Sequence, residues 1–427
     1  MSSQYGISIE MNTDSVGYPI YRMNEIHNML CDLNVDKYAD ISQEEYTSFA
    51  LNSGDVLFNR TNSFEWVGRT GIYYKTDDYD KRVFASYLVR FNPTKETILP
   101  EYLCAYLNCK YGVWDIKRRA RQSINQTNVN PEEVKEIEIP LLDKDIQSKI
   151  KDCFVSANDL RLKAKAAYDD ASNYLNLILG LDHLVLAEQS TTQKKFTDIK
   201  VSWRLDAEYY QPKYDELKHH FMQYEYKTLS EIAYIYRGDL ISENLYCEDV
   251  TRPAYIRGAD ISSNILLKDK CVYLDSSFVP NKEIKCKKND LVFALIGSVG
   301  TVARVTDEFI GSYISNNLGI IRLKENVDIS AEYLHLFLTA KNIGSLFFEQ
   351  KEMRTAQPKI APKDIEDFII PIISDEQQSH LIDLIQTSFI LRSKSNELLN
   401  LAKSSVEIAI EQGEDRAVEL LNQSIWQ

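Results

Sequence analysis

Short apolar runs separated by polar turns alternate along this chain with long stretches in which apolar residues recur every third or fourth position. The runs are β-branched or aromatic and are broken by Asn, Gly, Ser and Asp, a pattern that predicts short strands. Two strand-rich regions are expected, each with a short helix. The predicted strands are 18–22, 55–58, 71–74, 87–91, 254–257, 291–295, 301–305 and 319–323, and the short helices are 101–107 and 332–339.

A long amphipathic helix is predicted after each strand-rich region. From Ile146 the apolar spacing continues for five heptads, which is longer than an ordinary globular helix needs. At about 1.5 Å per residue such a helix is on the order of 55 Å long. We expect the two helices to pair as an antiparallel coiled coil with the β-rich domains at opposite ends, the alternative being that each helix packs on its own domain. The predicted spacer seam is Ile146, Ile150, Leu160, Ala164, Ala171, Ile178, Leu381, Leu384, Leu391 and Leu398.

The two halves of the chain share landmarks in the same order. The offset is 235 for Arg22/Arg257 and for Asp55/Asp290, 232 for residues 88–91 against 320–323, and 231 for Gln126/Gln357 and Gln147/Gln378. A nearly constant offset indicates two copies of one domain. The second copy has a strand-like lead-in at Leu229–Gly238. The first copy has only about 20 residues before Arg22 and no counterpart to Leu229–Ala233, so its lead-in strand is expected to be missing, which predicts either an absent N-terminal piece or replacement by the tail beyond Gln412.

These patterns give an α+β fold with an internal, pseudo-two-fold repeat, and they set the expected boundaries. The predicted parts are a β-rich domain at 1–142, a long helix at 143–187, a linker and lead-in at 188–226, a second β-rich domain at 227–374, a second long helix at 375–412 and a tail at 413–427.

Composition narrows the class of protein. The net charge is −14, which by itself argues against a nucleic-acid binder, although in a long chain the local charge decides contact. No apolar run reaches 18 residues and the N-terminus has no signal-peptide pattern, so a cytoplasmic protein without membrane contact is expected. The seven scattered cysteines predict reduced, packed thiols rather than a metal site.

No catalytic signature is present in the sequence. The chain lacks a phosphate-binding glycine loop, a Gly-x-Ser-x-Gly elbow, and the Asn/Asp-Pro-Pro-aromatic motif of amino-methyltransferases. We therefore predict a binding protein with no catalytic residues, no metal and no cofactor of its own.

The strongest candidate for binding chemistry is a basic run followed by amides. Five cations lie against one carboxylate between Lys110 and Arg121, and Gln, Asn and Thr follow, which can pair with base edges. The alternative is a solvated helix face followed by a polar loop. The candidate DNA-binding residues are Arg60, Asn62, Lys110, Lys117, Arg118, Arg119, Arg121, Gln122, Asn125 and Gln126 in the first copy, and Ser298, Lys351, Arg354, Thr355, Gln357 and Lys359 in the second.

Taken in order, the repeated motifs resemble the specificity subunit of type I restriction–modification systems. They are Gly-Asp-Val-Leu-Phe with Val-Gly, the Gln-x-x-Val/Ile-x-Pro run, an Ile-Pro stop, Gln-Ser at the helix start and a long heptad helix, and they cover roughly residues 19–409. The resemblance implies two target recognition domains that each read one half of a split, asymmetric DNA sequence. It also implies that the coiled coil sets the unread gap.

The resemblance further implies partners: double-stranded DNA, two modification (methyltransferase) subunits and restriction/translocase subunits. S-adenosylmethionine, ATP and Mg are then expected on those subunits. Two alternatives stay open: a recognition or scaffold subunit of another phage-defence complex, and the DNA-recognition part of a self-contained restriction–methylation enzyme.

Overall fold

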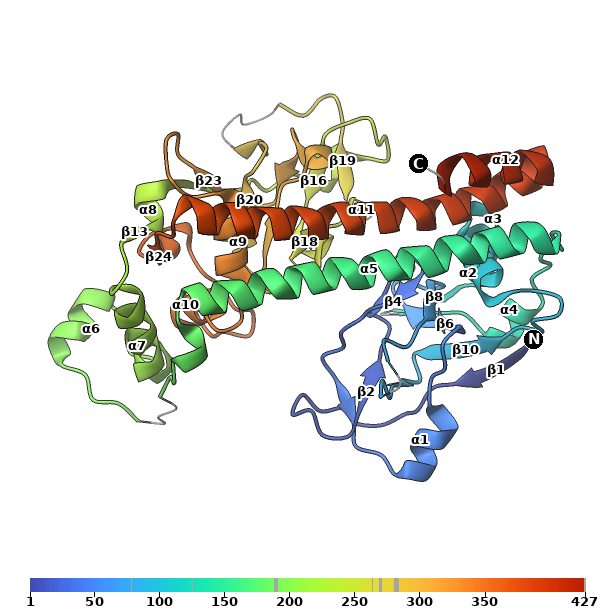
Figure 1. Ribbon diagram of the computed structural model, residues 1–427, viewed down its shortest axis with the longest axis horizontal. Coiled ribbons are helices and arrows are strands. Elements are labelled where there is room, and N and C mark those ends of the chain that lie inside the picture. Colours follow the sequence, from blue (N-terminus) through green and yellow to red (C-terminus); the bar gives the residue numbers. More distant parts are fainter. Residues whose placement is uncertain are drawn as a thin grey trace. The chain divides into compact units, whose positions relative to one another are not determined.

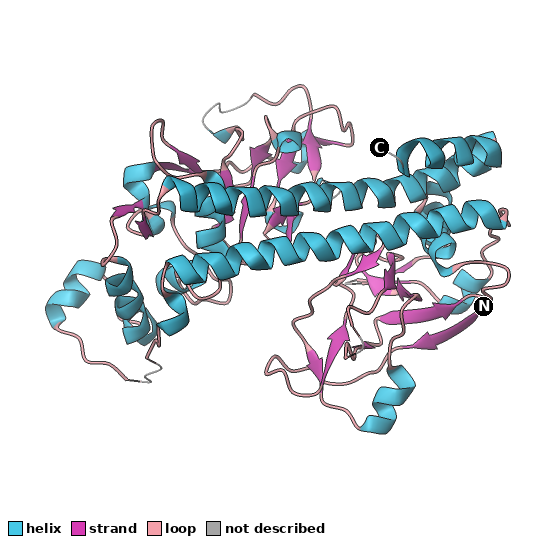
Figure 2. Cartoon of the chain, in the orientation of Figure 1, coloured by secondary structure: helices cyan, strands magenta, loops and turns pink. Residues whose placement is uncertain are grey.

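The chain forms two compact units in the computed structural model, which describes residues 1–77, 79–124, 126–187, 191–262, 264–268, 271–279 and 284–425 (Figure 1). Unit 1 contains Met1–Ala166 and Thr387–Gln427, and unit 2 contains Ala167–Gln386. Figure 2 shows helices and strands together in both units. The predicted α+β class with two β-rich regions is therefore confirmed.

Unit 1 is built on a main sheet with the strand order β1–β10–β6–β8–β4–β3. Val56, Leu57 and Phe58 in its centre are completely buried; both faces are covered, so these residues form a continuous apolar run instead of alternating with polar ones. The strands of the main sheet are β1 (Ser2–Tyr5), β3 (Ile26–His27), β4 (Leu30–Cys31), β6 (Asp55–Asn59), β8 (Thr70–Tyr73) and β10 (Leu88–Asn92). Smaller sheets have the orders β5 (Tyr38–Ala39), β2 (Tyr18–Tyr21), β9 (Val83–Phe84), and β11 (Arg121–Gln122), β12 (Thr127–Asn128), β7 (Thr61–Asn62).

Helices cover the sheet of unit 1. The first begins at a capping box in which Ser42 accepts from the backbone of Glu45 and the Glu45 carboxylate accepts from the backbone of Ser42. Pro100 stands at the first position of the next one, where its missing N–H costs nothing. The helices are α1 (Gln43–Phe49), α2 (Pro100–Asn108), α3 (Lys110–Arg118), α4 (Pro131–Lys135) and α12 (Glu414–Ile425).

Unit 2 repeats this plan with a sheet of order β14–β23–β20–β21 and another of order β15–β19–β16–β22. Its strands are β13 (Tyr226–Thr228), β14 (Ala233–Arg237), β15 (Tyr246–Cys247), β16 (Ala254–Ile256), β17 (Ile261–Ser262), β18 (Ile265–Leu266), β19 (Val272–Leu274), β20 (Leu291–Ala294), β21 (Val302–Arg304), β22 (Tyr313–Ile314), β23 (Leu318–Leu323) and β24 (Ile369–Pro371). Its helices are α6 (Phe196–Ser202), α7 (Pro212–Phe221), α8 (Leu229–Ile232), α9 (Ala331–Thr339) and α10 (Gly344–Lys351).

The two long helices are α5 (Lys144–Ile178) and α11 (Asp375–Gln412), and each contributes residues to both units. Within unit 1 the Ser388 hydroxyl donates to the carbonyl of Ala164 at 2.6 Å, and the Ser395 hydroxyl donates to that of Ala157 at 2.7 Å. Residue numbers increase along α11 while those of its bonding partners on α5 decrease, so the two helices run antiparallel, as predicted. The first helix ends at Ile178 rather than at residue 187, because Gly180 adopts a left-handed conformation (φ 61°).

Part of the predicted seam is displaced by one residue. Ile146, Ile150, Ala164, Ala171 and Leu381 are buried as expected. Leu160, Ile178, Leu384, Leu391 and Leu398 are only partly buried, and Leu179, Ile385 and Leu399 take the fully buried positions instead of their neighbours. In α11 the buried residues keep a strict heptad, with Leu381, Ser388, Ser395 and Ala402 at one position and Ile385, Leu399 and Val406 at the other. The spacing between the two positions is four residues where three was predicted, so the prediction chose the preceding residue.

A repeated Gln residue anchors each domain to the start of its long helix. The side-chain carbonyl of buried Gln147 accepts from the Leu99 N–H at 2.9 Å, and its amide donates to the carbonyls of Thr97 at 3.2 Å and Leu142 at 2.8 Å. In unit 2, Gln378 makes the same three kinds of bond. These repeated residues hold the fold together, which explains why they recur.

The predicted offset of 232 holds for the arginine side chains but not for the backbone of the same strands. Arg90 bonds to Asp55 and to the carbonyl of Ala50, as Arg322 bonds to Asp290 and to the carbonyl of Lys285. The Leu88 N–H donates to the carbonyl of Ala85, and the Leu318 N–H donates to the carbonyl of Ser315, in the same turn of each copy. The strand β10 therefore corresponds to β23 at an offset of 230 instead of 232. A shift of two residues leaves every side chain on the same face of a strand, so the apolar pattern could not detect it.

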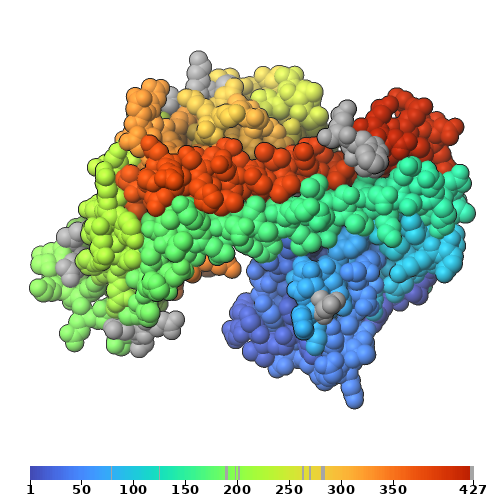
Figure 3. Space-filling view, viewed as in Figure 1, coloured from blue at the N-terminus to red at the C-terminus, as the bar shows by residue number. Residues whose placement is uncertain are grey.

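The predicted absence of a lead-in strand from the first copy is also wrong. Strand β1 pairs with β10 as β14 pairs with β23, and Leu229–Ile232, predicted as strand, is one helical turn. The C-terminal helix α12 contributes Ala417 and Leu421 to the core around Ile146 and Ile150. Figure 3 shows these C-terminal residues, in red, beside the start of α5. Of the two alternatives, the tail beyond Gln412 therefore does pack on the first copy.

Candidate nucleic-acid interface

A small polar sheet in unit 1 unites two of the predicted candidate segments. Thr127 in β12 pairs with Gln122 on one side and with Asn62 on the other, and the Thr61 hydroxyl donates to the Asn128 side chain at 2.6 Å. We call residues Arg121–Asn128 hairpin 1. The turn after β6 and the stretch after the basic run, which are about 60 residues apart in sequence, therefore form one surface.

Unit 2 contains the same construction. Met353 pairs with Lys359, and Lys359 pairs with Ile296. The Gly297 N–H donates to the carbonyl of Pro358 at 2.9 Å. We call residues Met353–Lys359 hairpin 2. The two copies therefore place a short hairpin against the turn that follows their central strand.

Hairpin 1 presents polar groups and one apolar side chain to solvent. Arg121, Gln122 and Gln126 are exposed, and Ile124 is 100% exposed near its tip. Asn125, another predicted contact, lies outside the described residues. Beside the hairpin, the guanidinium of Arg118 lies over the exposed ring of Trp114. Amides and guanidinium groups can bond to base edges and phosphates.

Arg60 lies next to hairpin 1, where the N–H of Val129 donates to its carbonyl at 2.9 Å. Its guanidinium lies 5.2 Å from the ring centre of half-exposed Tyr5 and contacts the carbonyl of Ser86. The sequence reasoning missed Tyr5 and Trp114. An aromatic residue within a cationic stretch is the signal that could have found Trp114, whereas Tyr5 has no Lys or Arg near it in sequence.

Hairpin 2 offers a different set of groups. Arg354 is partly exposed and donates to Glu349 at 3.0 Å. The Thr355 hydroxyl donates to the carbonyl of Gln357 at 2.5 Å, so it shapes the turn. Gln357 and Lys359 are exposed. The construction is common to both copies, and the side chains that it displays differ.

Two residues of the predicted basic run, Lys117 and Arg119, have structural partners instead of a free surface, whereas a third, Lys110, is paired and still keeps 55% of its side chain exposed. The Lys117 ammonium donates to the carbonyls of Phe64, Glu65 and Val67 and so fixes the loop after β7. Burial lowers the pKa of Lys117 to about 8. Arg119 pairs with Asp115 on its own helix, and Lys110 pairs with Glu411 of α11.

The remaining cations are divided between structure and surface. Lys351 pairs with Asp367 at 2.6 Å, with only 14% of its side chain exposed, so it belongs to the fold of unit 2. Arg121 pairs with Glu133 and keeps 71% of its side chain exposed. Arg118 pairs with Asp115 at 2.6 Å and keeps 58%. Exposed pairs of this kind are weak, so Arg118 and Arg121 can exchange their carboxylates for phosphate.

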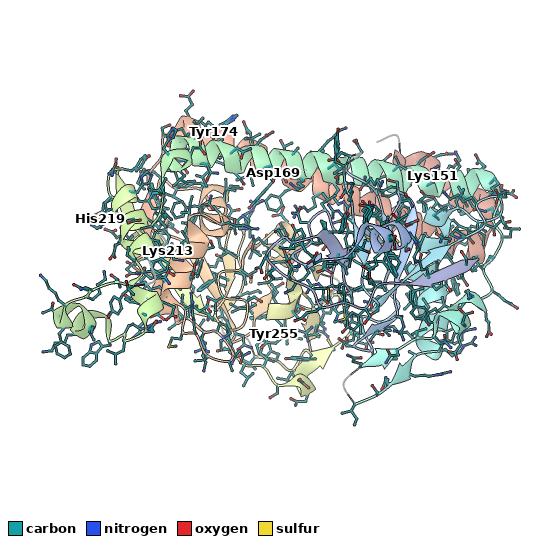
Figure 4. All side chains as sticks on the ribbon, turned by 90° about the horizontal axis from the view of Figure 1, so that it is seen from below. Lys151, Asp169, Tyr174, Lys213, His219 and Tyr255 are labelled. Atoms are coloured by element: carbon teal, nitrogen blue, oxygen red, sulfur yellow. The ribbon has the colours of Figure 1, made fainter. Side chains whose placement is uncertain are left out.

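A pocket of about 440 Å³ lies beside hairpin 2, and Ser298 alone among its lining residues was a predicted contact. It is lined by Gly258, Ala259, Ile261, Ala294, Ile296, Gly297, Ser298 and Thr301. Strand β16 ends just before Gly258 and Ala259, which line one side of the pocket. Tyr255 in that strand is labelled in Figure 4, and its hydroxyl donates to the carbonyl of Asp239 at 2.8 Å. Arg257 and Asp260 bond across the next turn, with the Arg257 N–H donating at 2.8 Å.

The described residues offer neither a metal-binding cluster nor a membrane-spanning helix. No cluster of His, Cys, Asp or Glu in that part of the chain could hold a metal ion. Among the same residues no helix combines the length and apolar character needed to cross a membrane.

Comparison with known proteins gives one family. The model of the family described as "Type I restriction modification DNA specificity domain" matches residues 7–163 and 222–400, one copy in each half of the chain. A putative type I restriction enzyme MjaX specificity subunit of Methanocaldococcus jannaschii is 31% identical over 146 residues, which are 34% of this chain and 34% of that protein. The EcoKI specificity subunit of Escherichia coli is 24% identical over 181 residues, 41% of this chain and 38% of that protein.

These matches span only about a third of the length of the curated relatives. Among solved structures, the S subunit of the type I restriction–modification system from M. genitalium aligns over 98% of this chain and 93% of that chain, at 13% identity and a TM-score of 0.39. The HsdS subunit from Thermoanaerobacter tengcongensis aligns over 96% and 95%, at 12% identity and a TM-score of 0.31.

Proposed function

We propose, because this chain belongs to the type I restriction modification DNA specificity family, that it is the DNA-recognition subunit of a type I restriction–modification complex. Each unit reads one half of a bipartite, asymmetric DNA target, and the paired helices set the gap between the halves. The observation that carries this proposal is the recurrence of one hairpin construction in both units with different exposed side chains. A shared construction with unlike side chains is what two unlike half-sites require.

The chemistry of the hairpins favours DNA over a protein partner. Gln122 and Gln126 in one copy and Gln357 in the other can pair bidentately with adenine, and all three are exposed. Arg121, Arg118 and Lys359 supply cations for phosphate next to them. The chain's charge of −14 is then carried elsewhere and is available to basic partners.

Catalysis belongs, in this proposal, to other subunits. Two modification subunits and restriction/translocase subunits would bind S-adenosylmethionine, ATP and Mg, and this chain would position them on the DNA. The complex would act in the cytoplasm. Incubating the purified chain alone with S-adenosylmethionine and DNA should give no methyl transfer, and transfer by this chain alone would overturn its assignment as a recognition subunit.

Mapping methylated positions in cells that express the chain with its modification subunits tests the proposal directly. The expected result is a two-part motif with a fixed gap. Replacing Arg121 and Gln122 with Ala should impair one half-site, and replacing Arg354 and Gln357 with Ala should impair the other. Ala207→Asn, at an exposed site of unit 2 outside hairpin 2, serves as the control. No enriched motif, or equal effects of both hairpin variants on both halves, would contradict the proposal.

A further inference from the structure

The pocket beside hairpin 2 has equivalent positions in unit 1 that carry larger side chains. The backbone pairing defines the equivalence. The backbone N–H of Ala294 donates to the carbonyl of Thr301, as the backbone N–H of Asn59 donates to that of Arg69. Likewise Gly297 is bonded to Pro358 in unit 2, and Asn62 pairs with Thr127 in unit 1. Gly258 and Ala259 follow Arg257 as Met23 and Asn24 follow Arg22. The pairs, unit 2 first, are Gly258/Met23, Ala259/Asn24, Ala294/Asn59, Gly297/Asn62 and Thr301/Arg69.

In unit 1 two of these larger side chains, Asn59 and Arg69, make contacts of their own. The Asn59 amide donates to the carbonyl of Met23 at 3.1 Å, so it bridges the two walls. The Arg69 guanidinium lies over Trp66 at 3.5 Å from the ring centre. The turn of unit 1 also contains three more residues than that of unit 2. Unit 1 therefore has a bridging Asn59 where unit 2 has the small Ala294 beside an open pocket.

The lining of the open pocket has a defined chemistry. Ala259, Ala294 and Ile296 give it small apolar walls, and Ser298 and Thr301 add hydroxyl groups. A Cβ atom built on Gly258 or Gly297 would meet nothing within 4 Å, so the space in front of both backbones is open. Ala and Thr side chains are the groups that contact the 5-methyl of thymine in the major groove, and Ser or Thr can bond to base edges.

We propose that this pocket receives the methyl-bearing edge of a thymine in the half-site that unit 2 reads. The inference rests on the proposed function. The pocket lies next to hairpin 2, because its lining residue Gly297 is bonded to Pro358 and its lining residue Ile296 pairs with Lys359. A base edge held by the hairpin therefore lies next to the pocket. In unit 1 the equivalent position carries Asn59 bonded to Met23, so we expect its half-site to be read by other contacts.

Replacing single thymines by uracil tests the inference, because uracil lacks only the 5-methyl group. Once the target has been mapped, duplexes with one uracil at a time are titrated with the complex of this chain and its modification subunits. At one thymine of the half-site read by unit 2, uracil should weaken binding about fourfold, the effect of one buried methyl group. A half-site without thymine, or without any thymine sensitive to the methyl group, would overturn the inference.

A variant that fills the pocket completes the test. Ala259 is exposed, so Ala259→Asn, which copies Asn24 of unit 1, should fold normally. Ala259→Asn should bind thymine and uracil targets equally, because the methyl group no longer enters the pocket. Ala207→Asn, the control, should keep the fourfold difference. A difference that persists in Ala259→Asn would overturn the inference and leave the proposed function intact, whereas the absence of any bipartite target would refute the proposed function itself.

Discussion

Removing the buried glutamine that anchors the first domain should destabilise unit 1 alone. Gln147 is completely buried and makes three hydrogen bonds to backbone groups at 2.8–3.2 Å. A buried hydrogen bond contributes about 1 kcal/mol net, and a buried backbone group left without its partner costs about 1–3 kcal/mol. We therefore expect Gln147→Ala to lower the free energy of unfolding of unit 1 by about 3 kcal/mol.

Hydrogen exchange of backbone amides measures this effect in each unit separately, which a single melting curve of a two-unit chain does not. About 3 kcal/mol corresponds to roughly a hundredfold faster exchange of the protected amides. The increase should be confined to peptides from unit 1, including helix α2. Gln378→Ala should accelerate exchange in unit 2 instead, because Gln378 makes the equivalent bonds.

Gln193→Ala, at an exposed position of the linker, is the matched control and should change neither unit. An acceleration of less than about threefold in unit 1 would refute the reasoning, since one hydrogen bond alone contributes about 1 kcal/mol. Equal acceleration in both units would refute it too, because the bonds of Gln147 stay within unit 1.

Three further predictions address the interface and the spacer. Burial lowers the pKa of Lys117 to about 8, below the ordinary value of about 10.4, so the unfolded chain binds more protons between these two values and the stability of unit 1 should rise with pH there. Lys117→Met should abolish that rise in pH-dependent hydrogen exchange without changing the salt dependence of DNA binding; a flatter salt dependence would show that Lys117 contacts phosphate. Arg121→Ala should reduce the log–log salt slope of binding by about 1, and an unchanged slope in salt titrations would show that Arg121 only pairs with Glu133. Inserting four residues near Ala166 should lengthen α5 by about 6 Å and widen the gap in the mapped target, and a gap that stays fixed would show that the helix does not set it.

The sequence predicted the repeat and the long helices because both depend on patterns that survive divergence. Gln147 and Gln378 recur at one offset because the buried bonds to the backbone need that amide in each copy. The second helix has the predicted bounds, Asp375–Gln412. The backbone pairing of β10 and β23 differs by two residues from the alignment that Arg90 and Arg322 give, and strand periodicity cannot distinguish registers that differ by two.

The candidate site was predicted in part. The hairpins and the turns beside them were singled out from their polar composition, and the strand pairing brings each hairpin and its turn together. Lys117, Arg119 and Lys351 show why charge alone misleads. A sequence does not distinguish a cation that bonds to carbonyls or to a neighbouring carboxylate from one that faces solvent. The pocket depended on small residues from segments about 40 residues apart, and a single sequence does not show that they converge.

Unit 1 is assembled from the two ends of the chain, and this affects how it folds during synthesis. The ribosome completes α5 long before it makes Thr387–Gln427, because the 220 residues of unit 2 come between them. At about 5–20 residues per second, the buried face of α5 in unit 1 waits roughly 10 to 45 s for α11 and α12. The nascent chain therefore exposes Ile146, Ile150 and Ala157 to solvent or chaperones during that interval, and a premature stop near the end of the message would damage the domain encoded first.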